Sequence, residues 1–343
     1  MFFHRDDNKK RKIKNLVFRG QPALMDKPNE VAIFYGGSSK TYSFPLGHPM
    51  SGDRAEAFWQ LIKKKKLNSA EGVEIHQPVQ ACEEDIRLFH KQEYINFVKK
   101  VSNEGTGFLD QGDTPAFKGV FEASRYVVGS TLQGLKMVMN KKVEHAFNPI
   151  GGLHHARREA AAGFCVFNDA AIAIIETKRK YELKRILYID IDAHHGDGVF
   201  YSFYDDPQVF IADIHEDGRF LYPGTGSENE RGEGDAKGTK LSIPVPPQTN
   251  DEGFKIVFDK VEKFIINVEP EIILFQCGGD GLKNDPIAHL EYSPQAYGFA
   301  AKKLHQLAHK FSEGRIIAMG GGGYSLDNTA KAWVKVVEGF LSH

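Results

Sequence analysis

The sequence predicts an α/β protein with three layers, in which a mostly parallel sheet carries helices on both faces. Two observations lead to this prediction. Short runs that are apolar throughout recur along the chain, and they alternate with longer amphipathic segments. Continuously apolar strands are typical of sheets buried on both faces, and their alternation with helices indicates parallel crossover connections. At 343 residues the chain is long enough to bury a substantial core.

Apolar runs and amphipathic spacing define the expected elements in the first half of the chain. Two apolar runs predict strands, and apolar side chains three and four residues apart predict helices. The basic run at 63–66 favours the C-terminus of the first helix through the helix dipole. In the second helix, Phe97 is among the residues spaced for burial. The expected elements are a strand at 31–35, helices at 54–66, 83–101 and 118–140, a strand at 146–150 and a helix at 169–180.

The second half alternates more regularly between apolar runs and amphipathic segments. No boundary to a second domain is evident, so we expect a single domain over residues 1–343. Residues 1–15 are expected to form a polar, basic N-terminal tail. The expected elements are strands at 186–191, 208–215, 241–245, 271–276 and 315–319, and helices at 253–268, 294–311 and 327–341.

Composition narrows the class of protein. The formal net charge is −1, from 44 Lys and Arg against 45 Asp and Glu, which argues against a nucleic-acid or membrane-surface binder. The three cysteines show no paired spacing, so we expect reduced thiols and a cytoplasmic location. No apolar run is long enough to span a bilayer, and the start lacks a signal-peptide pattern. The oligomeric state is left open.

A dense group of ionisable residues follows the apolar run at 186–191. Asp190 and Asp192 are two residues apart, so in strand geometry both point to the same side. Asp192 and His194 repeat this spacing, which places an oxygen and a nitrogen ligand on one face. A polar turn with solvated acids is the alternative, and it would explain one such residue better than this many. The stretch therefore predicts a divalent-metal site.

Other strand ends carry residues of the same kind. In parallel sheets covered by helices, ligands bind outside the carboxyl ends of the strands, so these residues are expected to share one rim. They are His154 and His155 after the strand at 146–150, Asp190 to Asp197, Asp280 after the strand at 271–276, and the glycines at 320–323 before Tyr324.

The residues at this rim suit metal-assisted hydrolysis. Asp192, His194 and Asp280 supply three ligands and leave positions open for water and substrate. A bound ion lowers the pKa of water and polarises a carbonyl group. A general base is needed beside that water, and His154 and His155 are the candidates.

Three further residues complete this chemistry. Asp190 and Asp197 are available to fix the tautomers of two imidazoles. Tyr324, held on a glycine run, can donate a hydrogen bond to a developing oxyanion. Each residue alone has an ordinary explanation, such as a turn or a core tyrosine. The glycine run could instead cradle a phosphate, but no Lys-Ser or Lys-Thr follows it.

Five motifs together resemble the histone deacetylase family in order and in spacing. The likeness extends from about Gly47 to the C-terminus. Within the family, the sequence is similar to the class I and acetoin-utilisation-type deacetylases of bacteria and archaea. It implies the arginase/deacetylase fold. The motifs are Gly151–Ala156, Gly163–Asp169, Asp190–Gly198, Pro223–Gly226 and Gly320–Tyr324.

The resemblance implies a role for each residue at the rim. The zinc ligands it implies are Asp192, His194 and Asp280. His155, paired with Asp197, corresponds to the general base that then protonates the leaving amine. His154, paired with Asp190, is implied to act mainly through its charge. Tyr324 corresponds to the donor to the carbonyl oxygen of the substrate.

The same resemblance implies a substrate tunnel. Phe164 and Tyr222 correspond to its aromatic walls around an acyl-lysine side chain, with Gly163 beside them. Asp113 corresponds to the rim acid that holds the substrate backbone. Arg54 corresponds to an arginine behind the site that lines an internal channel.

Monovalent cations are also implied by the resemblance. A structural K⁺ ion near the zinc would use Asp190, Asp192 and His194. Its usual serine ligand is replaced here by Asp213, an additional carboxylate. Asp206 stands where a second K⁺ site usually has another residue type.

Several functions are compatible with these residues. The leading one is a zinc-dependent hydrolase that removes acetyl or other short acyl groups from N-acyl-lysine, in a protein or a small acyl-amine. Two carboxylates and one imidazole also suit Fe²⁺. An acetylpolyamine amidohydrolase is the nearest alternative. The resemblance places Ile287 at a position that helps to choose between acyl-peptide and acyl-polyamine substrates, and an aliphatic residue there allows either. An arginase-like ureohydrolase fits Asp192-Ala193-His194, but the next acid falls one residue later than in that family. A non-catalytic reader of acylated partners is the remaining alternative.

Overall fold

The computed structural model describes residues 29–45 and 47–342, together with Met1. The expected basic tail at 1–15 therefore lies, apart from Met1, outside the described residues. Within the described residues, eight strands form one sheet in the order β2-β1-β3-β8-β7-β4-β5-β6. All of the neighbouring pairs are parallel, which confirms the predicted fold class.

The strands form where the sequence is apolar on both faces. In β4, Ile186 and Tyr188 join one core and Leu187 and Ile189 join the other, and all four are fully buried. The alternation of side chains along a strand thus serves two cores at once. The strands are β1 (Asn29–Phe34), β2 (Val73–His76), β3 (Val143–Asn148), β4 (Ile186–Asp190), β5 (Val209–Glu216), β6 (Lys240–Val245), β7 (Ile272–Gln276) and β8 (Ile316–Met319).

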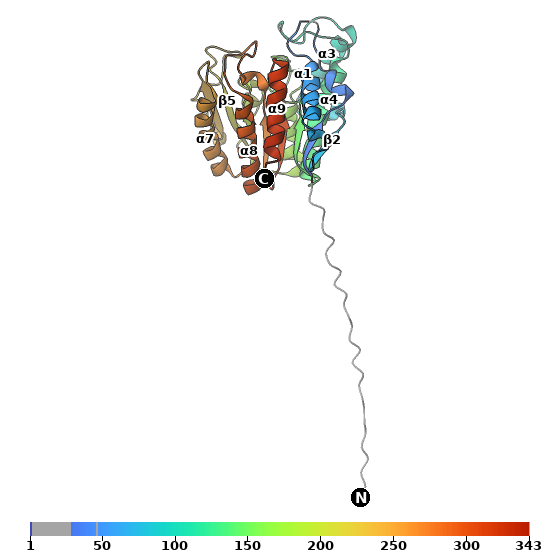
Figure 1. Cartoon of the computed structure of the whole chain (residues 1–343). Helices are drawn as coiled ribbons and strands as arrows, with labels where there is room; N and C mark the ends of the chain where they lie inside the picture. Colours follow the sequence, from blue (N-terminus) through green and yellow to red (C-terminus); the bar gives the residue numbers. More distant parts are fainter. Residues whose placement is uncertain (2–28, 46, 343) are drawn as a thin grey trace.

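Helices cover both faces of the sheet. Buried residues of α1, α7, α8 and α9 share one core, and α1, α8 and α9 lie together in front of the sheet in Figure 1. Residues of α3, α4, α5 and α6 share the core on the other face. The helices are α1 (Asp53–Lys64), α2 (Glu83–Ile86), α3 (Gln92–Glu104), α4 (Val120–Met139), α5 (Asp169–Tyr181), α6 (Asp197–Ser202), α7 (Asp251–Val268), α8 (Pro294–Phe311) and α9 (Leu326–Phe340).

Short 3₁₀ turns at Gly37–Lys40, Leu67–Ser69, Gly234–Ala236 and Gly279–Gly281 complete the regular structure. None of the described helices has the length and apolar character needed to cross a bilayer. The three cysteines are free thiols, as expected.

The expected helix at 83–101 is wrong in one respect, because the structure has two helices there. The segment between them bonds to a distant loop instead of continuing the helix. The N–H of Lys91 donates to the carbonyl of Arg158, and His90 Nε2 accepts the N–H of Asn168 at 2.9 Å. Phe97, expected to be buried, is 40% exposed on α3.

Two elements were not anticipated. Strand β2 has only four residues, all half-buried, and lies at the edge of the sheet, so it lacks the apolar run of the inner strands. Helix α6 begins within the ionisable stretch after β4, where the functional residues hide the helical pattern.

The strand register aligns the carboxyl ends of β3, β8, β7 and β4, where the functional residues are expected. Asp190 pairs with Gln276, Gln276 with Met319, and Met319 with Asn148, each being the last residue of its strand. The chain passes from β3 to β4 over two intervening strands, β8 and β7. The loops that leave these four neighbouring strands therefore begin side by side, as expected for a ligand site in a parallel sheet.

The neutral form of His90 should make stability depend on pH. Its Nε2 accepts a hydrogen bond, and burial lowers its pKa to about 3. Unfolded histidine takes up a proton near pH 6.5, so this stabilisation is complete above that pH and is lost as pH falls towards 3. When the pH falls from 7 to 5, the free energy of unfolding of the unchanged protein should decrease by about 2 kcal/mol more than that of His90→Gln. Urea denaturation at both pH values measures this, and equal losses would contradict it.

Candidate active site

Three predicted ligands meet beyond the ends of β4 and β7. His194 Nδ1 lies 3.1 Å from Asp192 Oδ1 and 3.1 Å from Asp280 Oδ2. One ligand atom from each of the three lies within 4.8 Å of the others, and all three residues are buried. Oxygen and nitrogen ligands at this spacing fit a four-coordinate ion with one open position. The set therefore fits the metal expected from the sequence.

The charge balance of these residues also favours a cation. Burial and the neighbouring Asp192 raise the pKa of Asp280 to about 7. Burial alone would lower the pKa of His194, but hydrogen bonds to Asp192 and Asp280 raise it to about 10. The raised pKa values of Asp280 and His194 thus favour bound protons where two carboxylates and an imidazole are buried together. A divalent ion can replace those protons and offset the same negative charge.

Backbone and amide groups hold the ligand carboxylates. Asp192 Oδ2 accepts hydrogen bonds from Gln276 Nε2 at 2.8 Å and from the N–H of Gly322 at 2.9 Å. Asp280 Oδ1 accepts the N–H of Ala193 at 2.8 Å. These bonds fix one oxygen of each carboxylate and leave the other facing His194. Gln276 was not anticipated, because it looks like the ordinary end of an apolar strand.

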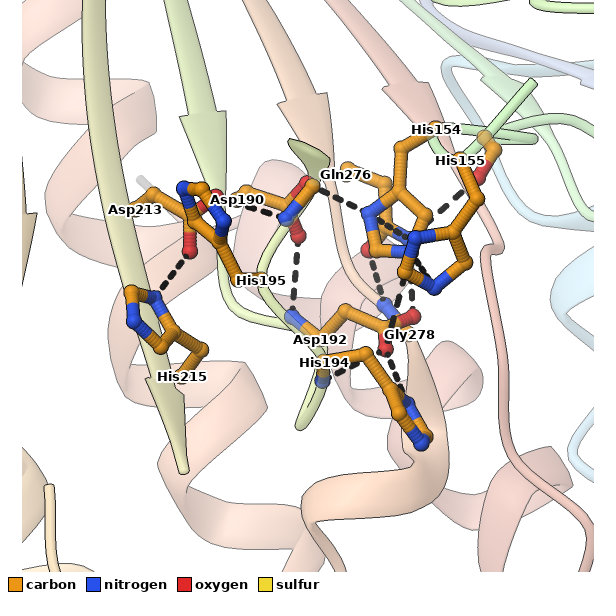
Figure 2. Close-up of polar contacts among 12 residues, drawn as sticks. His154, His155, Asp190, Asp192, His194, His195, Asp213, His215, Gln276 and Gly278 are labelled. Atoms are coloured by element: carbon orange, nitrogen blue, oxygen red, sulfur yellow. Dashed lines mark hydrogen bonds and ion pairs between the residues drawn. The ribbon is translucent and has the colours of Figure 1, made fainter. Parts of the chain in front are cut away.

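The histidine pair lies beside this cluster, as Figure 2 shows. His154 Nδ1 is 2.8 Å from Asp190 Oδ2, and His155 Nδ1 is 2.8 Å from Asp197 Oδ1, which are the two pairings expected. The two Nε2 atoms are 3.1 Å apart. His154 Nε2 is also 3.9 Å from Asp192 Oδ1. Both outer nitrogens therefore face the space next to the metal ligands.

The two imidazoles differ in their affinity for protons. Burial would lower the pKa of His154, but the charges of Asp190 and Asp192 raise it to about 10. Burial and the neighbouring His154 lower the pKa of His155 to about 4, against the opposing effect of Asp197. These shifts favour the charged form of His154 and the neutral form of His155 at neutral pH. Of the two rings, His155 is therefore the one with an unprotonated Nε2 that can accept a proton.

Two further residues support the histidine pair, and neither was anticipated. Tyr188 donates to Asp190 Oδ2 at 2.6 Å. Arg157 donates to Asp197 Oδ2 at 3.0 Å, and this bond and that from His155 lower the pKa of Asp197 to about 2, although burial alone would raise it. Tyr188 lies two residues before Asp190 in the strand, which was the one available signal.

The loop that carries Tyr324 is fixed from two sides. Asp285 Oδ2 accepts the N–H of Tyr324 at 2.8 Å, and its Oδ1 accepts the N–H of Ile287 at 3.0 Å. Arg54, which is buried, donates to the carbonyls of Gly321 and Gly323 at 2.9 and 3.2 Å. Burial and the nearby carboxylates hold the pKa of Tyr324 well above its usual range. The phenol therefore keeps its proton and can donate it in a hydrogen bond.

Aromatic residues surround the approach to the site. The ring of Tyr222 is centred 5.1 Å from that of His155, and the ring of Phe164 is 5.9 Å from that of Tyr324. Gly163 packs against His155, where a Cβ atom would lie 2.5 Å from the imidazole. The structure thus brings these expected tunnel residues together around the histidine pair.

A cavity of about 580 Å³ opens beside Tyr222 and is lined by Asp113 and Arg157. The Asp110 carboxylate accepts the N–H groups of Gly112, Asp113 and Thr114, so it shapes the rim loop. Burial and the neighbouring Asp110 raise the pKa of Asp113 to about 6. The expected rim acid therefore borders an open space.

Residues expected at the monovalent sites have protein partners. Asp213 Oδ1 lies 2.7 Å from His215 Nδ1, and its Oδ2 accepts the N–H of Gly196 at 2.9 Å. Figure 2 shows Asp213 and His215 on the side of the cluster away from the histidine pair. Asp206 forms an ion pair with Lys178.

Comparison with known proteins gives the family of this chain. The chain matches the family described as the histone deacetylase domain over residues 48–340. The chain belongs to the histone deacetylase family. Among its relatives, the acetoin utilization protein AcuC of Bacillus subtilis (strain 168) is 39% identical over 311 residues, which cover 88% of this chain and 80% of the relative.

Two further members of the family extend this comparison. The histone deacetylase RPD3 of Saccharomyces cerevisiae (strain ATCC 204508 / S288c) is 32% identical over 93% of this chain and 74% of its own length. An AcuC protein of Staphylococcus aureus (strain MSSA476) is 34% identical over 93% of this chain and 83% of its own length. The resemblance inferred from the five motifs is confirmed.

The site leaves no room for a side chain at Gly322. A Cβ atom there would lie 2.1 Å from Asp280 Oδ2 and 3.0 Å from Asp192 Oδ2. Gly322→Ala should therefore lower the free energy of unfolding by about 1–3 kcal/mol, the usual cost of overpacking. Urea denaturation provides the measurement. Gly37→Ala is the matched control, because a Cβ atom there meets nothing within 4 Å. Equal stability of the two variants would show that the loop yields freely.

Proposed function

We propose that this member of the histone deacetylase family is a zinc-dependent hydrolase that removes acetyl or other short acyl groups from N-acyl-lysine or a related acyl-amine. The observation that carries the proposal is the meeting of two buried imidazoles, His154 and His155, with the cluster of Asp192, His194 and Asp280. This combination supplies ion ligands and a proton acceptor in one buried space. Family membership supports deacetylation as the reaction class.

The metal cluster would hold Zn²⁺ through one nitrogen and two carboxylate oxygens. A zinc ion bound there would supply a Lewis acid that polarises the acyl carbonyl and lowers the pKa of water. His155 is the group to accept the proton of the attacking water, since its Nε2 faces the site and Asp197 orients the ring. The same nitrogen would then return a proton to the leaving amine. His154, charged beside Asp190, would stabilise negative charge without transferring its proton.

Tyr324 would donate its hydroxyl proton in a hydrogen bond to the carbonyl oxygen as negative charge develops there. Its high pKa keeps the phenol protonated, and the bonds of Asp285 and Arg54 to its loop hold it in place. Phe164 and Tyr222 would hold the aliphatic part of the substrate side chain between their rings. This arrangement excludes water from around the amide.

The substrate is proposed to be an acyl-lysine in a protein or peptide in preference to an acetylpolyamine. Asp113 borders the open cavity and can accept N–H groups of a substrate backbone. Ile287 is aliphatic and compatible with either substrate, so the preference for acyl-lysine depends on Asp113. A cytoplasmic location remains part of the proposal, supported by three free thiols.

A structural K⁺ ion is also proposed near Asp190 and Asp213. These residues lie opposite each other on β4 and β5. Burial and the charge of Asp213 raise the pKa of Asp190 to about 6, although His154 opposes this shift. A monovalent cation between the strands would offset that repulsion.

The first test measures deacetylation of a fluorogenic acetyl-lysine peptide by protein reconstituted with Zn²⁺ or, without oxygen, Fe²⁺. We expect turnover that a hydroxamate chelator inhibits. Such a result would test the metal, the tunnel and the reaction together. His155→Ala should be almost inactive and retain metal, whereas Asp192→Ala should lose both. Acetylspermidine, acetylputrescine and arginine serve as alternative substrates. Turnover of a polyamine alone would overturn the preference for acyl-lysine. Release of urea, or tight zinc binding without any turnover, would refute the proposed function.

The role of Tyr324 has its own test. Tyr324→Phe removes one oxyanion donor, which should lower kcat by about 10²–10³ and leave zinc content unchanged. Steady-state kinetics with the peptide and metal analysis of the same sample measure both. The matched control is Tyr201→Phe, at a tyrosine that is 41% exposed on α6. An undiminished kcat in Tyr324→Phe would remove the hydroxyl from the mechanism.

A further inference from the structure

A second group of potential metal ligands lies away from the candidate active site. His145 is the third residue of β3, whereas the histidine pair follows the end of that strand. His305 and His309 lie in the last two turns of α8. One ring nitrogen from each of the three lies within 4.8 Å of the others. Within residues 29–45 and 47–342, it is the one group of this kind besides Asp192, His194 and Asp280.

The cluster forms where α8 crosses the amino-terminal half of β3. His305 and His309 are four residues apart, so they lie on one face of the helix. Their ring centres are 4.5 Å apart, and that of His145 is 5.2 and 5.9 Å from them. His145 also packs against Phe340 at the end of α9, the helix that leads to the C-terminus marked in Figure 1. The three rings therefore converge from a strand and a helix.

Two of the ring nitrogens face each other, and a nitrogen of the third ring lies within 4.8 Å of a nitrogen in each of the other two rings. His145 Nε2 lies 2.9 Å from His305 Nδ1, so one proton lies between two nitrogens that could both bind an ion. The distance between these two nitrogens is close to the distance between neighbouring ligand atoms around a zinc ion, whose bonds to histidine nitrogen are about 2.0–2.1 Å long. Glu144 Oε2 is 3.5 Å from His309 Nε2, which places a negative charge beside the cluster. A carboxylate next to a ligating histidine is a common supporting contact.

Burial differs among the three rings in a way that allows both access and rigidity. His145 is fully buried, and its Nδ1 has no hydrogen-bond partner among the described residues. The side chain of His309 is 41% exposed. An ion can therefore enter from solvent on the side of His309 and meet a ligand that the core already holds in place.

We propose that His145, His305 and His309 form a second site for a divalent transition-metal ion, with Zn²⁺ as the ion it fits. Three imidazoles suit Zn²⁺, Ni²⁺ and Cu²⁺, and they do not suit Mg²⁺ or Ca²⁺, which prefer oxygen ligands. The site joins the end of α8 to the sheet, so its role is structural. It shares no residue with the candidate active site and does not depend on the proposed function.

The test compares zinc content and thermal unfolding of the full chain and of His305→Ala/His309→Ala. After removal of metal and reloading with Zn²⁺, the unchanged protein should retain about one zinc ion per chain more than the double variant. Zinc should raise the Tm of the unchanged protein further than that of the variant, because an ion that binds only the folded state stabilises it. Deacetylase turnover should be the same in both, which separates this site from the active site.

Two controls keep the result interpretable. His76→Ala removes a half-buried histidine on β2 that is paired with Glu74, so it should retain the full zinc content. His309→Ala alone changes a more exposed residue, so it covers the case in which the double variant does not fold. Equal zinc content in the unchanged protein and His309→Ala, with an equal rise in Tm, would overturn the proposal. So would loss of the second ion in His76→Ala.

Discussion

The architecture depends on burying negative charge at the ends of neighbouring parallel strands. Five carboxylates in and around the site have at most 1% of their surface exposed, and the large desolvation cost of burying them must be offset locally. The residues are Asp169, Asp190, Asp192, Asp213 and Asp280. Backbone N–H groups, buried histidines and close-packed glycines surround them because each relieves part of that cost. Asp169, for example, accepts the N–H groups of Gly152 and Leu153, which lead into the histidine pair.

The parallel sheet makes this concentration of charge feasible. The neighbouring strands β3, β8, β7 and β4 end at the same level, so one loop can supply the N–H groups that another loop's carboxylates need. The N–H of Ala193 after β4 serves Asp280 after β7, and that of Gly322 after β8 serves Asp192. The site is therefore held mainly by contacts between residues far apart in the sequence. Its geometry is a property of the sheet as a whole.

This dependence explains what the sequence could and could not reveal. Inner strands were predictable because residues such as Ile186 and Leu187 must be apolar on both faces. The rim residues were predictable because strand ends of a parallel sheet converge. The break before α3 was not predictable, because it depends on a bond between His90 and the distant Asn168. Local patterns contain no information about such a contact.

Supporting residues were missed for the same physical reason. Tyr188 looks like one more apolar member of β4, although its hydroxyl bonds to Asp190. Arg157 looks like a solvated surface arginine, although it shares Asp197 with His155. Asp285 looks like a turn residue before a proline. Each acquires its role from a partner that only the folded chain brings near.

Asp285 also links two positions that a protein engineer would prefer to vary separately. One of its oxygens accepts the N–H of Ile287, for which the family resemblance implies an influence on substrate choice, and the other accepts that of Tyr324. A change of backbone conformation at Ile287 that displaces Asp285 also displaces the phenol. Under the proposed function, selectivity and turnover would therefore not be independent traits in this scaffold. Evolution towards a new substrate must keep this shared carboxylate in place or rebuild both loops together.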